Sequence, residues 1–172
     1  MTKGTVNYNI ENLNFLVIDD NRHMLTLVRK VLHALGSKKV TETEDAAEAF
    51  KIMKSITPDI IICDWNMTPL DGLEFTRMVR TGADSPNPYV PIIMLTGHSE
   101  VKMVMEARDA GVNEYLVKPI SIKALYDRIS TIISRPRPFI RTGSFFGPDR
   151  RRRDMAIKGN ERRNEIPVAT SV

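Results

Sequence analysis

Polar residues able to handle phosphate stand directly behind four short apolar segments of this 172-residue chain. They are Asp19 and Asp20, Asp64, Thr96 and Lys118. Three carboxylates held close together repel one another and raise one another's pKa unless a cation joins them, and an all-oxygen ligand set suits Mg²⁺. Because Mg²⁺ commonly keeps waters and pairs with phosphate oxygens, a magnesium site at these aspartates would leave room for a phosphoryl group.

The same set supplies the other groups that phosphoryl transfer requires. Lys118 provides positive charge, and Thr96 provides a hydroxyl that can donate to a phosphoryl oxygen. A carboxylate can attack phosphorus to form an aspartyl phosphate, which makes Asp64 the natural nucleophile. An aspartate pair behind a strand is also a common helix N-cap, so Asp19 and Asp20 alone decide nothing. It is the match of the complete set of strand-end positions that favours phosphate chemistry.

The apolar segments predict the strands that bring these residues together. We expect strands over residues 15–18, 60–63, 92–95 and 115–117, and a weaker one over 39–43. The four stronger segments are continuously apolar instead of alternating, as strands buried on both faces of a parallel sheet require.

Helical patterns separate the predicted strands. The first shows apolar residues at i, i+3 and i+4 spacing, and the third is expected near residues 70–81. The N-caps expected for the second, fourth and fifth helices are Asp45, Ser99 and Ser121. Five alternating strands and helices predict an α/β fold, a doubly wound five-stranded parallel sheet with helices on both faces. Ligands bind such sheets at the carboxyl ends of the strands, where the polar set stands.

The ordered set Asp19-Asp20, Asp64, Thr96, Tyr115 and Lys118-Pro119 resembles the response regulator receiver family over roughly residues 13 to 134. The segment Asp64-Trp65-Asn66-Met67 is also similar to the phosphorylation-site segment of the bacterial chemotaxis receiver. The resemblance implies a flavodoxin-like (βα)5 fold.

The resemblance also implies a role for each aspartate. Asp64 would accept the phosphoryl group, and Asp20 and Asp64 would bind Mg²⁺ directly. Asp19 would assist through water, and the backbone carbonyl of Asn66 would be a further ligand.

By the same resemblance, Thr96 and Lys118 contact the phosphoryl oxygens, and Tyr115 is the aromatic switch residue coupled to Thr96. The bond from Lys118 to Pro119 is expected to be cis. This sequence departs from familiar members beside the threonine, where His98 takes the place of an acid or another polar residue. We expect His98→Ala to change the rate of autodephosphorylation.

The implied function is a phosphorylation-dependent signalling switch of a two-component phosphorelay. A histidine kinase or a histidine phosphotransfer protein would donate to Asp64, and the output would be contact with a downstream protein that the sequence does not identify. Such a stand-alone response regulator is not an enzyme in the metabolic sense, since it assists only its own phosphorylation and autodephosphorylation.

Composition bounds the rest of the chain. The single cysteine, Cys63, excludes an internal disulfide framework. No apolar run approaches the roughly 18 residues of a membrane span, and the start of the chain lacks a secretory signal pattern, so we expect a cytoplasmic protein. Charge divides unevenly: residues 135–172 hold ten Arg and Lys against four Asp and Glu, a net of +6, and the rest carries −2.

These patterns predict an N-terminal extension over residues 1–12, a receiver domain over 13–134 and an irregular basic tail over 135–172. Two Arg-Pro pairs begin the tail, which is expected to be extended or disordered. Candidate contacts for a protein partner in it are Phe139, Phe145, Phe146, Arg150, Arg151, Arg152 and Arg153. The phenylalanines could instead fold back over the output face of the receiver, which the resemblance places on the fourth helix, the fifth strand and the fifth helix.

Two other functions stay open at this point. One is a phosphorylation-independent adaptor that acts through its tail. The other is a regulator that binds nucleic acid through the arginine run, which the slightly acidic domain disfavours.

Overall fold

A computed structural model of the chain describes residues 7–97 and 101–151 and the backbone of 166–168. Its main sheet is parallel with the strand order β2-β1-β3-β4-β5. The strands are β1 (Asn14–Ile18), β2 (Lys39–Thr43), β3 (Ile60–Asp64), β4 (Ile92–Thr96) and β5 (Glu114–Val117). The helices are α1 (Arg22–Ala34), α2 (Ala46–Ser55), α3 (Gly72–Thr81), α4 (Val101–Ala110) and α5 (Ile122–Ser134).

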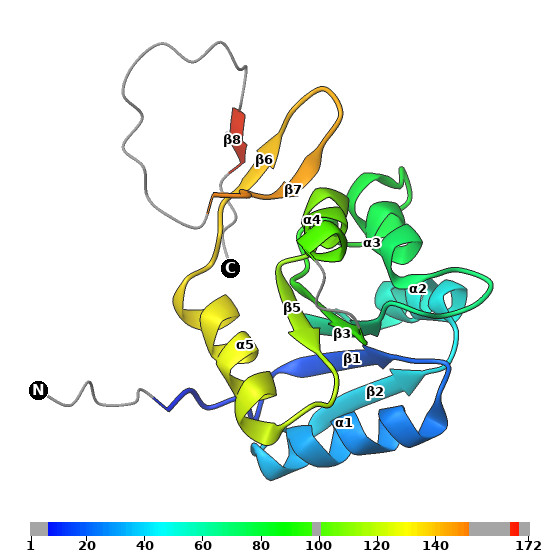
Figure 1. Cartoon of the computed structure of the whole chain (residues 1–172), viewed down its shortest axis with the longest axis vertical. Coiled ribbons are helices and arrows are strands. Elements are labelled where there is room, and N and C mark those ends of the chain that lie inside the picture. The colour runs from blue at the N-terminus through cyan, green and yellow to red at the C-terminus, as the bar shows by residue number, and fades with distance from the viewer. Residues whose placement is uncertain (1–6, 98–100, 152–165, 169–172) are drawn as a thin grey trace, which may run out of the picture.

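The sheet lies between two helical layers (Figure 1). Helices α1 and α5 cover one face, and α2, α3 and α4 cover the other. Successive side chains of β1 enter opposite cores, because Phe15 packs on the α1 and α5 side while Leu16 packs on the other. The predicted doubly wound, flavodoxin-like α/β fold is confirmed. Within the described chain, no helix is long and apolar enough to cross a membrane.

Helix starts follow local capping rules. The Asp45 and Ser121 side chains accept hydrogen bonds from the backbone N–H three residues later, at 2.8 and 3.1 Å, so both are N-caps as predicted. The third helix begins at Gly72 instead of residue 70, because Asp71 forms a reciprocal capping box with the glutamate three residues on. Ser99, expected to cap the fourth helix, lies outside the described residues.

The N-terminal segment before β1 is part of the packed domain. Ile10 is 1% exposed and belongs to the core on the α1 and α5 side. The backbone N–H of Tyr8 donates to the hydroxyl of Tyr126 on α5, at 2.8 Å. The described part of the predicted extension 1–12 therefore packs against the domain.

Beyond α5 the chain forms a second, antiparallel sheet with the strand order β7-β6-β8. Its strands are β6 (Phe139–Arg141), β7 (Phe146–Pro148) and β8 (Ile166–Val168). The sequence analysis expected an irregular tail and did not predict this pairing. The reason is physical, since strands of three residues, two of which contain a proline, are too short for a periodic hydrophobic signal.

The tail phenylalanines fold back onto the receiver and are not exposed anchors for a partner. Phe139, Phe145 and Phe146 are 3%, 6% and 4% exposed. They pack at the end of α3 and at the loops before β4 and β5. The expectation that they could cover the output face, formed by α4, β5 and α5, is therefore wrong. Arg150 and Arg151 are exposed. Arg152 and Arg153 lie outside the described residues.

Candidate functional site

The strand register brings the predicted polar residues to one edge of the sheet. Ile18 pairs with Cys63, and Thr96 pairs with Val117, so the residues at or just after these strand ends meet. Asp19 and Asp64 are almost completely buried there, and so is Thr96. Parallel strands end at a common edge, which is why the sequence order alone predicted this neighbourhood.

Lys118 links two of the aspartates. Its Nζ lies 2.7 Å from Oδ1 of Asp64 and 3.6 Å from Oδ2 of Asp19. The first contact is a short charge-assisted hydrogen bond, and the second is a looser ion pair. One ammonium therefore faces two buried carboxylates, which leaves an excess of negative charge.

The third carboxylate completes an acidic cluster. Oxygen atoms of Asp19, Asp20 and Asp64 all lie within 4.8 Å of one another. Oδ1 of Asp19 accepts from the backbone N–H of Asn21 at 2.9 Å, but its buried Oδ2 has no hydrogen-bond partner among the described residues. An unsatisfied buried carboxylate oxygen is costly in a folded chain. The residues present therefore fit a divalent cation with a preference for oxygen ligands.

The electrostatics of the cluster point the same way. Burial raises the pKa of Asp19, the Asn21 amide opposes that rise, and the charge of Asp64 adds to it. Burial alone would lower the pKa of Lys118, but its hydrogen bond and charge interaction with Asp64 reverse the direction and raise it. Lys118 therefore stays an ammonium at neutral pH, whereas the charge of Asp19 is poorly compensated. A bound cation would relieve this imbalance.

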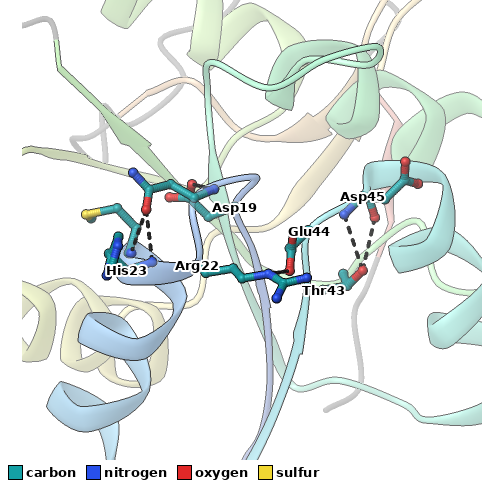
Figure 2. A network of polar contacts seen from close by, with 8 residues as sticks. Asp19, Arg22, His23, Thr43, Glu44 and Asp45 are labelled. Atoms are coloured by element: carbon teal, nitrogen blue, oxygen red, sulfur yellow. Dashed lines mark hydrogen bonds and ion pairs between the residues drawn. The ribbon is translucent and has the colours of Figure 1, made fainter.

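The turn after β1 leaves Asp20 available to the cluster. Asn21 caps α1, because its side-chain oxygen accepts from the backbone N–H of His23 at 2.9 Å and of Met24 at 3.4 Å (Figure 2). Asp20 is exposed and is not the N-cap of this helix. Asn21, the residue after the aspartate pair, is therefore the N-cap of α1, and neither aspartate has that role.

An exposed ion pair joins the start of α1 to the residue after β2. Arg22, the first residue of α1, pairs with Glu44, which directly follows β2 (Figure 2). Both side chains are largely exposed, so we assign the pair little stabilising energy.

Gly72 is a positioning residue that the sequence analysis missed. A Cβ atom at this position would lie 2.4 Å from the carbonyl oxygen of Asp64 and 2.8 Å from Sδ of Met94. Its N–H donates to the carbonyl of Trp65 at 2.9 Å. The start of α3 can therefore pack directly against the backbone of Asp64 only if this residue has no side chain. The available signal was a glycine immediately behind a capping aspartate.

Thr96 and Tyr115 lie on the same face of the sheet. Tyr115 pairs with Met94, and Met94 stands two residues before Thr96, so alternation directs all three side chains to the α4 side. Tyr115 is half-buried there. The backbone N–H of Lys118 donates to the carbonyl of Thr96 at 2.7 Å.

Three further expectations concern the loops around the site. The bond from Lys118 to Pro119 is cis, as expected. Asn66 is exposed two residues after Asp64, and the role of its carbonyl stays a prediction. His98 lies outside the described residues.

The fold and the site define a flavodoxin-like α/β domain with an acidic site at the carboxyl ends of its strands. A family model described as response regulator receiver domain matches residues 15–130. The chain belongs to this family, and it is a phosphorylation-dependent signalling switch of a two-component system. Members are signalling proteins and not enzymes of metabolism, and receiver domains bind Mg²⁺ at an acidic site.

Individual relatives support this placement. Chemotaxis protein CheY of Pseudomonas aeruginosa is 32% identical over 123 residues, which cover 72% of this chain and 98% of the relative. Chemotaxis protein CheY-3 of Vibrio cholerae is 30% identical over 125 residues, with coverages of 73% and 95%. The solved receiver domain of the histidine kinase CKI1 from Arabidopsis thaliana, complexed with Mg²⁺ and BeF3⁻, is 26% identical. Its TM-score is 0.65, and the likeness covers 73% of this chain and 93% of that one.

Proposed function

We propose that Asp64 is the phosphoryl acceptor of this receiver and that Lys118 and Thr96 hold the transferred group. The observation that carries the proposal is the 2.7 Å contact between the Lys118 ammonium and the buried Asp64 carboxylate, at an edge crowded with two further carboxylates. Phosphoryl transfer requires a nucleophile held in a fixed position and a positive charge near the transferred group. The contact with Lys118 would meet both requirements.

The transfer exchanges one bond to phosphorus for another. A carboxylate oxygen of Asp64 forms a bond to phosphorus while the bond from phosphorus to the donor nitrogen breaks, and the donor keeps that electron pair. Lys118 would move its hydrogen bond from Oδ1 of Asp64 to a phosphoryl oxygen. The Thr96 hydroxyl would donate to a second phosphoryl oxygen.

The metal proposed for this chain is Mg²⁺. Asp20 and Asp64 would bind it directly, Asp19 through water, and the Asn66 carbonyl would be a further ligand. The ion, when bound, neutralises charge that develops on the phosphoryl oxygens. The buried Oδ2 of Asp19, which accepts no hydrogen bond from a described residue, supports this assignment.

Output would pass from Thr96 through Tyr115 to the surface of α4, β5 and α5. A phosphoryl group that draws Thr96 toward it would open space that Tyr115 can enter, since both side chains share one face. Three large apolar side chains stand exposed on α4 and α5, Val101, Met105 and Ile122. The proposed donor is a histidine kinase or a histidine phosphotransfer protein, and the proposed receiver of the signal is another protein.

The test is incubation of the full chain with Mg²⁺ and a small-molecule phosphodonor, followed by intact-mass measurement. We expect the wild type to gain one phosphoryl group and Asp64→Asn to gain none. The matched control is Asp84→Asn, which removes an exposed carboxylate of the loop before β4 and should leave the gain unchanged. Phosphoryl gain that persists in Asp64→Asn would place the acceptor elsewhere.

A further inference from the structure

The C-terminal hairpin, residues 137–151, packs on a surface of the receiver away from the acidic site. We call this the hairpin surface and define it as Arg80 of α3, Tyr89, Asp109 of α4 and the loop 111–113. The loop 111–113 leads directly into β5, and Tyr89 lies just before β4, so the hairpin surface is at the amino ends of these strands. The region after residue 130 is outside the match to the family.

An aromatic cluster holds the hairpin on this surface. The ring of Tyr89 lies 5.2 Å from that of Phe139 and 5.3 Å from that of Phe146, between ring centroids. The guanidinium of Arg80 lies 5.0 Å from the centroid of the Phe139 ring. Aromatic pairs and cation–π contacts at such distances each contribute roughly 0.5–1.5 kcal/mol beyond the buried area.

Polar contacts attach the hairpin to the loop before β5. Arg137 donates to the backbone carbonyls of Asn113 and Val112, the second at 3.4 Å. It also donates to the carbonyl of Asp149 at 3.1 Å, which joins the two ends of the hairpin. A Cβ on Gly147 would lie only 3.0 Å from Cα of Gly111, so the two backbones are in close contact.

A further contact reaches α4 itself. Arg150 pairs with Asp109 near the end of α4, at 3.1 Å, while its guanidinium lies 4.1 Å from the centroid of the buried Phe145 ring. The hairpin therefore contacts both the end of α4 and the loop that leads into β5. In the structure with these contacts, Lys118 is hydrogen-bonded directly to Asp64.

We infer that packing of the C-terminal hairpin on the hairpin surface opposes occupation of the acidic site by a phosphoryl group. The inference rests on the proposed function, in which Tyr115 of β5 and the α4 surface rearrange on phosphorylation. A rearrangement that moves the end of α4 relative to the loop before β5 would lose hairpin contacts, because the hairpin contacts both. By linkage, a phosphoryl group at Asp64 loosens the hairpin by the same factor as the hairpin weakens phosphoryl binding.

The test measures beryllofluoride affinity in the presence of Mg²⁺ by fluorescence of Trp65, the one tryptophan of the chain, which directly follows Asp64. Phe146→Ala removes a ring of the aromatic cluster from the hairpin, and Tyr89→Leu removes one from the receiver. Each should bind beryllofluoride at least about fivefold more tightly than the wild type, the lower end of coupling between sites. The matched control Ser144→Ala, at an exposed position of the hairpin turn, should not change the affinity.

Hydrogen exchange supplies the reciprocal measurement. The amide of Asp149 donates to the carbonyl of Pro138 at 2.8 Å, so it reports the closed hairpin. Beryllofluoride with Mg²⁺ should speed its exchange in the wild type by a similar factor. Tyr89→Leu decides the matter if Phe146→Ala does not fold.

The outcomes separate the two proposals. A wild type that binds no beryllofluoride contradicts the proposed function and the inference together. A wild type that binds it, with affinity unchanged in the cluster variants and Asp149 exchange unchanged by the ligand, supports the proposed function and overturns the inference.

Discussion

Two buried charged regions lie at opposite edges of the same sheet and differ in how their charges are satisfied. At the carboxyl edge, Asp19 and Asp64 share one ammonium, that of Lys118, and a buried oxygen of Asp19 has no hydrogen-bond partner in the described chain. At the amino edge, Arg80 is 2% exposed and forms no ion pair with any described residue.

Uncharged groups accept the hydrogen bonds of the buried Arg80 side chain. Its Nε donates to the carbonyl of Gly111 at 3.0 Å, and Nη1 donates to that of Pro88 at 2.7 Å. Nη2 donates to Oδ1 of Asn113 at 2.9 Å, and Phe139 covers the planar face. Burial lowers the pKa of Arg80 to about 9, which still leaves the side chain charged at neutral pH, and each of its three side-chain nitrogens has an acceptor.

The difference teaches how to tell a ligand site from a structural one. Both regions bury charge that is not fully balanced by opposite charge, yet every side-chain nitrogen of Arg80 has an acceptor, whereas the buried Oδ2 of Asp19 accepts no hydrogen bond from a described residue. Unused acceptor capacity there is best explained by a cation that comes from outside. At the amino edge the chain supplies its own cover, so Arg80 joins α3, two loops and the hairpin.

Replacing Arg80 tests whether the amino edge is a structural junction. Arg80→Ala leaves the carbonyls of Gly111 and Pro88 and the amide of Asn113 without their donor and opens a cavity. We expect the free energy of unfolding to fall by about 3–5 kcal/mol, measured by urea denaturation.

The control for that experiment is Arg77→Ala, one turn earlier on the same helix and exposed, which should change stability by less than about 0.5 kcal/mol. An Arg80 variant as mild as this control would show that the amino edge is not a structural junction.

The sequence predicted the fold and the carboxyl edge because both depend on local signals. Continuous apolar runs identified the strands, and polar residues at their ends were brought together by parallel pairing alone. The same signals predicted that Asp19, Asp64 and Lys118 lie beside one another, as their ion pairs show, and that Thr96 ends a strand at the same edge.

The amino edge could not be predicted in this way. Arg80 reads as an ordinary surface residue of a helix, and its acceptors lie 8, 31 and 33 positions away in the chain. The hairpin strands are too short for periodicity, and the role of Phe139 depends on a partner from another element. Contacts of this kind follow from tertiary packing and carry no sequence pattern.

Gly72 offers a way to sharpen the comparison at the carboxyl edge. Gly72→Ala would push a methyl group against the carbonyl of Asp64 and force α3 away from β3. We expect a loss of about 1–3 kcal/mol in the free energy of unfolding and slower phosphoryl gain at Asp64. Gly143→Ala is the control, since a Cβ there meets nothing within 4 Å. Equal stability and phosphoryl gain in both variants would contradict the close approach.

The smallest expected effect tests whether the carboxyl edge is unbalanced before a cation binds. The raised pKa of Asp19 means that the folded chain disfavours its ionised form relative to the unfolded chain, so at neutral pH this charge lowers stability. Asp19→Asn should therefore raise the free energy of unfolding without Mg²⁺ by about 0.5–2 kcal/mol. It should also reduce the added stability that Mg²⁺ gives the wild type by mass action. Asp20→Asn, at an exposed carboxylate, should weaken the Mg²⁺ response with little change in its absence. If Asp19→Asn instead lowers the free energy of unfolding, the ion pair of Asp19 with Lys118 stabilises the fold by more than burial of the Asp19 charge destabilises it.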